Sequence, residues 1–153
     1  LSCDDEQIVS LELSMIAYNG FSHGTIVIDC QDDKMQLKLT TYDSGNEVIE
    51  SERHPIPSLP YKEFKATILP LEIKSMKELS NLYLIDGLDA EIVYHDRYGN
   101  FNRFLTRVPA LRGRNLFLIE AVIELAKSLP ISAEHKSYLE SLYTGYLIYC
   151  RKG

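Results

Sequence analysis

Five arginines within one short stretch are the side chains of this sequence best suited to bind an anion. Residues 97–119 contain no Lys, Asp or Glu. The arginines, with a neighbouring tyrosine, are Arg97, Tyr98, Arg103, Arg107, Arg112 and Arg114. The planar guanidinium forms paired hydrogen bonds with carboxylates and phosphates. The stretch therefore predicts either a contact site for an anionic ligand or acidic partner, or a sheet face where Arg103 and Arg107 pair with Glu91 and neighbouring acids.

The histidines offer no catalytic or metal-binding motif. They are His23, His54, His95 and His135. None has a second ligand at the intervals that zinc sites use. The sequence also has no nucleophile elbow, no phosphate-cradling glycine loop and no His-Glu-x-x-His. We therefore expect no cofactor, no metal and no enzyme activity. A hydrolase is the third hypothesis, and it would require a pocket that gathers His95 or His54 with a nucleophile and a carboxylate.

The first six residues carry a possible lipid-attachment cysteine. Leu1-Ser2-Cys3 is followed by Asp4-Asp5-Glu6. This pattern resembles the end of the lipobox of bacterial envelope lipoproteins, with the acids resembling a signal for export to the cell surface. The resemblance implies lipidation at Cys3 and an outer-membrane location, on the surface or the periplasmic side. Because the sequence does not begin with Met, we expect a mature or trimmed form.

Two further cysteines are left if Cys3 carries a lipid. In an oxidising envelope, an even number of remaining thiols favours a disulfide between Cys30 and Cys150. The alternative is a pair of buried thiols that pack as small apolar side chains.

Most of the elements that would position these side chains are strands in the first half of the chain. Apolar and polar residues alternate over 9–15 and 35–39, and 25–30 is β-branched and apolar, which predicts strands. A shorter strand is expected at 47–50. The proline-rich residues 54–61 predict a stiff extended connector.

The middle of the chain is less regular until a hairpin begins. Residues 64–69 suggest a strand and 72–82 a short helix. Residues 90–95 and 101–108 predict a hairpin, because Asp96-Arg97-Tyr98-Gly99 suits a type I turn followed by a bulge. That register places Ile92, Tyr94 and Phe104 on one face.

The last third predicts two helices. Residues 116–129 are apolar almost all round, and Pro130 ends that segment. Ser132 suits the N-cap of a second helix. Strands followed by a helical hairpin predict an α+β fold: an antiparallel sheet of about five to seven strands with a C-terminal two-helix hairpin on one face. We expect residues 1–7 to be a flexible tether and 8–153 a single domain.

The charge of the chain restricts its partners. The formal net charge is −6 and the pI is about 5.2, which disfavours nucleic acid and favours a basic protein partner. No apolar run is long enough to span a membrane, so membrane contact is expected only through lipid at Cys3. Small acidic α+β envelope proteins resemble immunity proteins, which cover the active sites of basic toxins. The leading hypothesis is thus a non-enzymatic protein-binding lipoprotein, with anionic-ligand binding by the arginine-rich hairpin as the alternative.

Overall fold

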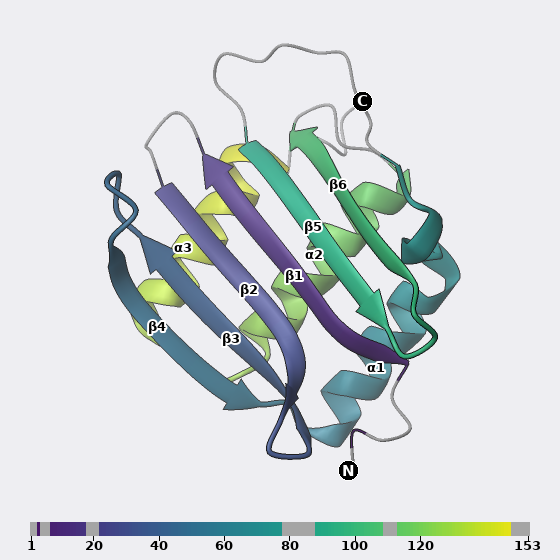
Figure 1. The fold of residues 1–153 in the computed structure, drawn as a ribbon. Helices are drawn as coiled ribbons and strands as arrows, with labels where there is room; N and C mark the ends of the chain where they lie inside the picture. The colour runs from purple at the N-terminus through teal and green to yellow at the C-terminus, as the bar shows by residue number, and fades with distance from the viewer. Residues whose placement is uncertain (1–2, 4–6, 18–21, 78–87, 109–112, 148–153) are drawn as a thin grey trace.

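An antiparallel sheet and a layer of helices make up the part of the chain that the structure describes (Figure 1). The computed structural model describes residues 3, 7–17, 22–77, 88–108 and 113–147. The strands are β1 (Ile8–Ala17), β2 (Ser22–Gln31), β3 (Lys34–Tyr42), β4 (Val48–Pro55), β5 (Leu88–Asp96) and β6 (Phe101–Val108). Their order in the sheet is β4-β3-β2-β1-β5-β6, and all neighbours are antiparallel. The expected α+β class is confirmed.

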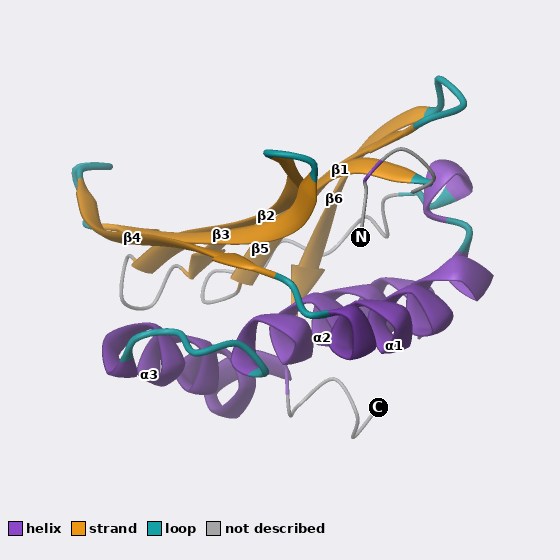
Figure 2. Cartoon of the chain, turned by 90° about the horizontal axis from the view of Figure 1, so that it is seen from below, coloured by secondary structure: helices purple, strands orange, loops and turns teal. Residues whose placement is uncertain are grey.

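Three helices cover one face of the sheet and leave the other face open (Figure 2). They are α1 (Ser58–Ile68), α2 (Gly113–Lys127) and α3 (Ala133–Leu142). The two C-terminal helices were expected, and α1 is the addition: it lies beside α2, whereas α3 lies under β3 and β4 (Figures 1 and 2). No helix among the described residues is long and apolar enough to cross a membrane.

Helix α1 corrects two expectations. The extended connector over 54–61 and the strand over 64–69 are both wrong, because β4 continues to Pro55 and α1 begins three residues later. Pro60 lies in the first turn of α1, where a missing N–H costs no helical hydrogen bond. Tyr61, Phe64 and Ile68 then recur at helical spacing and face the core.

The expected helix over 72–82 is also replaced. Its described part forms only a 3₁₀ turn, Ile73–Ser75, and residues 78–82 lie outside the described residues. Glu72 precedes the turn with a left-handed φ of 52°, and Met76 after it is extended, so no α-helix propagates.

The core lies between the sheet and the helices. In β1, Leu11, Leu13 and Met15 are buried as the alternation predicts. Val9 is 48% exposed instead, because the pairing of β1 with β5 shifts register between Ile8 and Ser10 and turns the side chain outward.

The β5–β6 hairpin has the predicted register. Ile92 pairs with Phe104, and both are buried together with Tyr94. Asp96 Oδ1 accepts hydrogen bonds from the backbone N–H groups of Tyr98 and Asn100, both at 2.9 Å. Gly99 has φ +83°, the left-handed value that the bulge position requires.

The N-terminus of α3 is capped as predicted. Ser132 Oγ accepts a hydrogen bond from the backbone N–H of His135 at 3.1 Å. The helix ends at Leu142 and continues as a π-helical turn, Tyr143–Leu147. This capped end of α3 lies close to β4, which determines the polar contacts described below.

Candidate functional site

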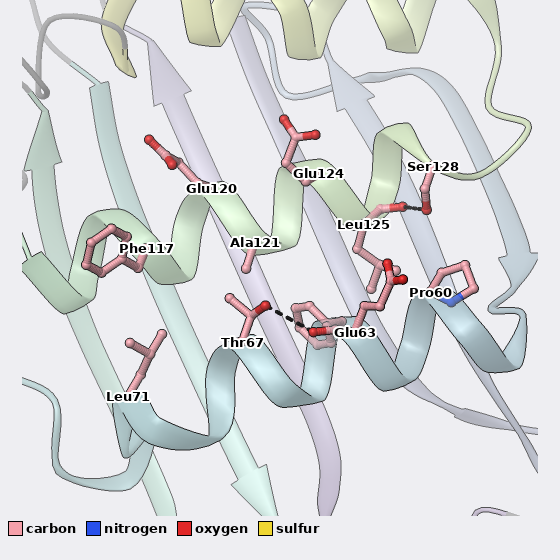
Figure 3. A pocket seen from close by; sticks show the side chains of 11 residues that line it. Pro60, Glu63, Thr67, Leu71, Phe117, Glu120, Ala121, Glu124, Leu125 and Ser128 are labelled. Atoms are coloured by element: carbon pink, nitrogen blue, oxygen red, sulfur yellow. Dashed lines mark hydrogen bonds between the residues drawn. The ribbon is translucent and has the colours of Figure 1, made fainter.

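A groove of about 450 Å³ runs between α1 and α2 on the side of the helix layer facing away from the sheet (Figure 3). Its apolar lining comes from the short connection after α1 as well as from both helices. These residues are Pro60, Phe64, Leu71, Phe117, Ala121 and Leu125. Phe64, Leu71 and Leu125 are buried, so the floor belongs to the core, whereas Phe117 is 55% exposed. Phe117 is the large apolar side chain in this groove that is left in contact with water.

Three glutamates are among the residues that line the groove. Glu63 comes from α1, and Glu120 and Glu124 come from α2 one helical turn apart. The lining contains no Lys or Arg among the described residues. Lys127 Nζ lies 3.8 Å from Glu124 Oε1 and 3.3 Å from Glu140 Oε1, so two carboxylates share this cation. The groove is therefore apolar inside. Figure 3 shows Glu63 pointing from α1 toward the groove, whereas the carboxylates of Glu120 and Glu124 project from the side of α2 that faces away from α1.

A second concentration of polar groups lies between β4 and the start of α3. Glu52 accepts hydrogen bonds from His54 Nε2 at 2.6 Å, from the backbone N–H of Ser132 at 3.0 Å, and from His135 Nδ1. Burial alone would raise the pKa of Glu52. The hydrogen bonds from His54, Ser132 and His135 outweigh it and lower the pKa to about 2. Glu52 is thus a charged anchor that fixes α3 to the edge strand.

In this cluster a hydroxyl, an imidazole and a carboxylate contact one another in that order. Thr41 Oγ1 lies 3.2 Å from His135 Nε2, and His135 Nδ1 contacts Glu52. Such a relay activates nucleophiles in hydrolases. Here Thr41 is 9% exposed and His135 only 1%, so a substrate cannot reach either one in this conformation.

The hydrolase hypothesis gains no support from the two histidines on which it depended. His54 is hydrogen-bonded to Glu52. His95 lies on the exposed side of β5, with its ring 4.8 Å from that of Phe101. The two residues sit on different strands and do not converge on a shared nucleophile among the described residues.

The arginines that can be described are spread over the molecule. Arg103 on β6 bonds both oxygens of Glu91, at 3.1 and 3.3 Å, as the sheet-face hypothesis predicts. Arg97 stacks over the Tyr98 ring at the hairpin turn, 5.9 Å from its centroid. Arg114, near the start of α2, donates to the backbone oxygen of Leu71.

These contacts leave little for an anion-binding site. The side chain of Arg107 and the whole of Arg112 lie outside the described residues. A hollow beside β6 is lined by Arg103 and Lys77, but Glu91 lines it too and neutralises part of their charge. Among the described arginines, none converges with another on one ligand position.

The cysteines pair differently from the expectation. The structure joins Cys3 to Cys30, with Cα atoms 6.1 Å apart. The expected bridge between Cys30 and Cys150 is therefore wrong in this structure, because the Cys30 sulfur is already bonded; Cys150 lies outside the described residues. The same bond excludes lipid on the Cys3 sulfur while it persists. Cys3 lies at the β2–β3 hairpin, where its backbone N–H donates a hydrogen bond to Asp33 Oδ1 at 3.2 Å.

Comparison with known proteins adds no family to these observations. No protein-family model matches the sequence, and no curated protein matches it significantly.

Proposed function

We propose that this chain is a non-enzymatic protein-binding domain whose α1–α2 groove receives the apolar face of a basic amphipathic segment of a partner protein. The observation that carries the proposal is an apolar groove that has three glutamates among its lining residues. An amphipathic helix presents apolar residues at helical spacing with charges on either side, and such a helix docks in grooves of this kind. A lysine or arginine beside its apolar face would meet Glu63, and long cationic side chains that reach across α2 would meet Glu120 and Glu124.

The overall charge supports the same partner. A net charge of −6 attracts a basic protein at long range and speeds its encounter with the groove. Phe117 would bury its exposed surface on docking, and aromatic side chains of this type contribute strongly at contact centres. Within this class, we propose an inhibitor of a basic toxin in the bacterial envelope.

We base the proposed location of the protein on the disulfide rather than on lipidation of Cys3. A Cys3–Cys30 bridge persists in oxidising compartments such as the bacterial periplasm or the cell surface. A lipid-anchored form would carry the lipid on Cys3 and would have Cys30 as a thiol instead. The mass of the protein purified from its own envelope distinguishes the two forms.

The binding test uses a defined probe. The probe is a fluorescein-labelled peptide of leucine and lysine arranged with helical period, and its counterpart has glutamate in place of lysine. Fluorescence anisotropy should show saturable binding of the lysine peptide, weakening steeply as salt increases. The glutamate peptide should not bind. Absence of binding by the lysine peptide at any salt concentration would overturn the proposal.

Matched variants locate the binding site. Phe117→Ala should weaken binding at least tenfold, since it removes the exposed apolar side chain of the groove. Phe101→Ala is the control, because Phe101 is 56% exposed on β6 and lies outside the groove. Equal losses in both variants would show that the peptide adheres to exposed apolar surface without using the groove.

The charge of Glu120 and Glu124 is tested in the same way. The double variant Glu120→Gln, Glu124→Gln should bind more weakly and with less dependence on salt. A second double variant, Glu47→Gln with Glu134→Gln, removes the same charge from exposed positions off the groove. If both double variants behave alike, the net charge of the protein rather than Glu120 and Glu124 attracts the peptide.

A further inference from the structure

We infer that His135 Nε2 and the Glu50 carboxylate form a binding site for a divalent transition-metal ion of the zinc class. The three residues Glu50, Glu52 and His135 bring ligand-type atoms within 4.8 Å of one another. They come from β4 and α3, so the sequence gives no metal-binding spacing. This site is separate from the α1–α2 groove.

The hydrogen bonds of Glu52 determine which nitrogen of His135 is available. A carboxylate can only accept, so His135 Nδ1 carries the proton that contacts Glu52. In the neutral ring, Nε2 then presents a lone pair. Carboxylate–histidine pairs of this kind orient the opposite nitrogen toward a metal in known metal sites.

The available nitrogen faces a second ligand. His135 Nε2 lies 3.8 Å from Glu50 Oε2, and with a neutral ring these two lone-pair atoms have no hydrogen between them. Two ligands of a tetrahedral zinc ion lie about 3.4 Å apart, so a small side-chain movement brings both into range. A positive charge between the two atoms would remove their repulsion.

A bound ion would replace one existing hydrogen bond. Thr41 Oγ1 lies 3.2 Å from Nε2, and with the proton on Nδ1 its hydroxyl donates to Nε2; once an ion takes that lone pair, the hydroxyl turns to another acceptor. The Glu50 side chain is 32% exposed at the edge strand and gives an ion its first contact, whereas His135 is 1% exposed, so Nε2 joins only after the side-chain movement described above. Glu52 is held by His54 and Ser132, so we assign it as a positioning residue rather than a ligand.

The alternative to a metal ion between His135 Nε2 and Glu50 Oε2 is a proton on Nε2. A protonated His135 would donate from Nε2 to Thr41 or to Glu50 and would pair with the carboxylates without any metal. Imidazole ¹⁵N spectroscopy separates the two cases, because metal binding shifts Nε2 while Nδ1 keeps its proton. The shift is read on the unmodified residue, so it does not depend on a His135 variant that folds.

The experiment is a titration with zinc chloride, followed by calorimetry and by the ¹⁵N spectrum, near neutral pH. It uses untagged protein with the disulfide intact and the substitution Cys150→Ser, which removes the third thiol as a competing ligand. We expect one ion per chain, with a shift of His135 Nε2. Glu50→Gln should weaken zinc binding at least tenfold, and Glu63→Gln, in the groove, should leave it unchanged. No zinc-dependent shift at millimolar zinc, or equal affinity in Glu50→Gln, would overturn the inference.

Discussion

Replacing Glu52 by glutamine should remove a large part of the stability that α3 gains from β4. The pKa of this carboxyl is lowered from 4.5 to about 2, so its charged form is preferred in the folded state. A shift of this size corresponds to about 3 kcal/mol of folding stability at pH 7, taken as an upper value. The side chain is only 17% exposed, so solvent screens these contacts weakly.

The dependence on pH follows from the direction of the shift. A carboxyl whose pKa is lowered on folding stabilises the fold at pH values above its pKa in the unfolded state. This stabilisation is lost as the pH falls toward its pKa in the folded state. The contribution of Glu52 should therefore be complete above about pH 5, fall to about 1 kcal/mol near pH 3 and nearly vanish at pH 2. Glutamine cannot ionise, so Glu52→Gln lacks this contribution throughout.

The assay is urea denaturation of the wild-type protein and Glu52→Gln between pH 7 and pH 2. Glu91→Gln is the control, since Glu91 forms an exposed pair with Arg103 and should cost less than about 1 kcal/mol. A difference in the free energy of unfolding between wild type and Glu52→Gln that stays constant down to pH 2 would refute the reasoning. So would a difference at pH 7 no larger than that of the control.

Three further predictions concern packing, the disulfide and the arginines. Gly24→Ala should destabilise the protein by about 1–3 kcal/mol in thermal denaturation, because the new Cβ would lie 2.3 Å from the Tyr138 hydroxyl; no loss of stability would contradict that close approach. Reducing the bridge between Cys3 and Cys30 should lower the free energy of unfolding by about 3 kcal/mol, because it closes a loop over 27 residues; non-reducing peptide mapping that finds another pairing would contradict the assignment. Arg103→Ala should cost less than about 1 kcal/mol in urea denaturation, because it removes one exposed ion pair; a loss above 2 kcal/mol would show a structural role.

Local chemistry made the β5–β6 hairpin predictable. Asp96 and Gly99 specify the turn by themselves, and the alternation on either side then fixes which residues face the core. The cap at Ser132 was predictable for the same reason. Helix α1 was not, because three prolines within 54–61 favour extended backbone when considered singly. Its position depends on Tyr61, Phe64 and Ile68 packing under the sheet, which is a tertiary effect.

The two sites could not be predicted because their residues meet only in the fold. Glu63 and Glu120 line one groove from helices far apart in the chain, and neither helix alone is unusual in sequence. Glu52 and His135 are separated by 83 residues, so no motif spacing joins them. The arginines show the reverse case. They are close in sequence, but the fold places Arg97 at the β5–β6 turn, Arg103 on β6 and Arg114 near the start of α2.

The most direct test of the groove is a ¹H–¹⁵N correlation spectrum recorded while the lysine peptide is added. The proposal predicts shifts centred on the groove, at Thr67, Ala121 and Leu125, with the open sheet face unchanged. Shifts confined to that open face, for example at Val27 and Val93, would contradict it.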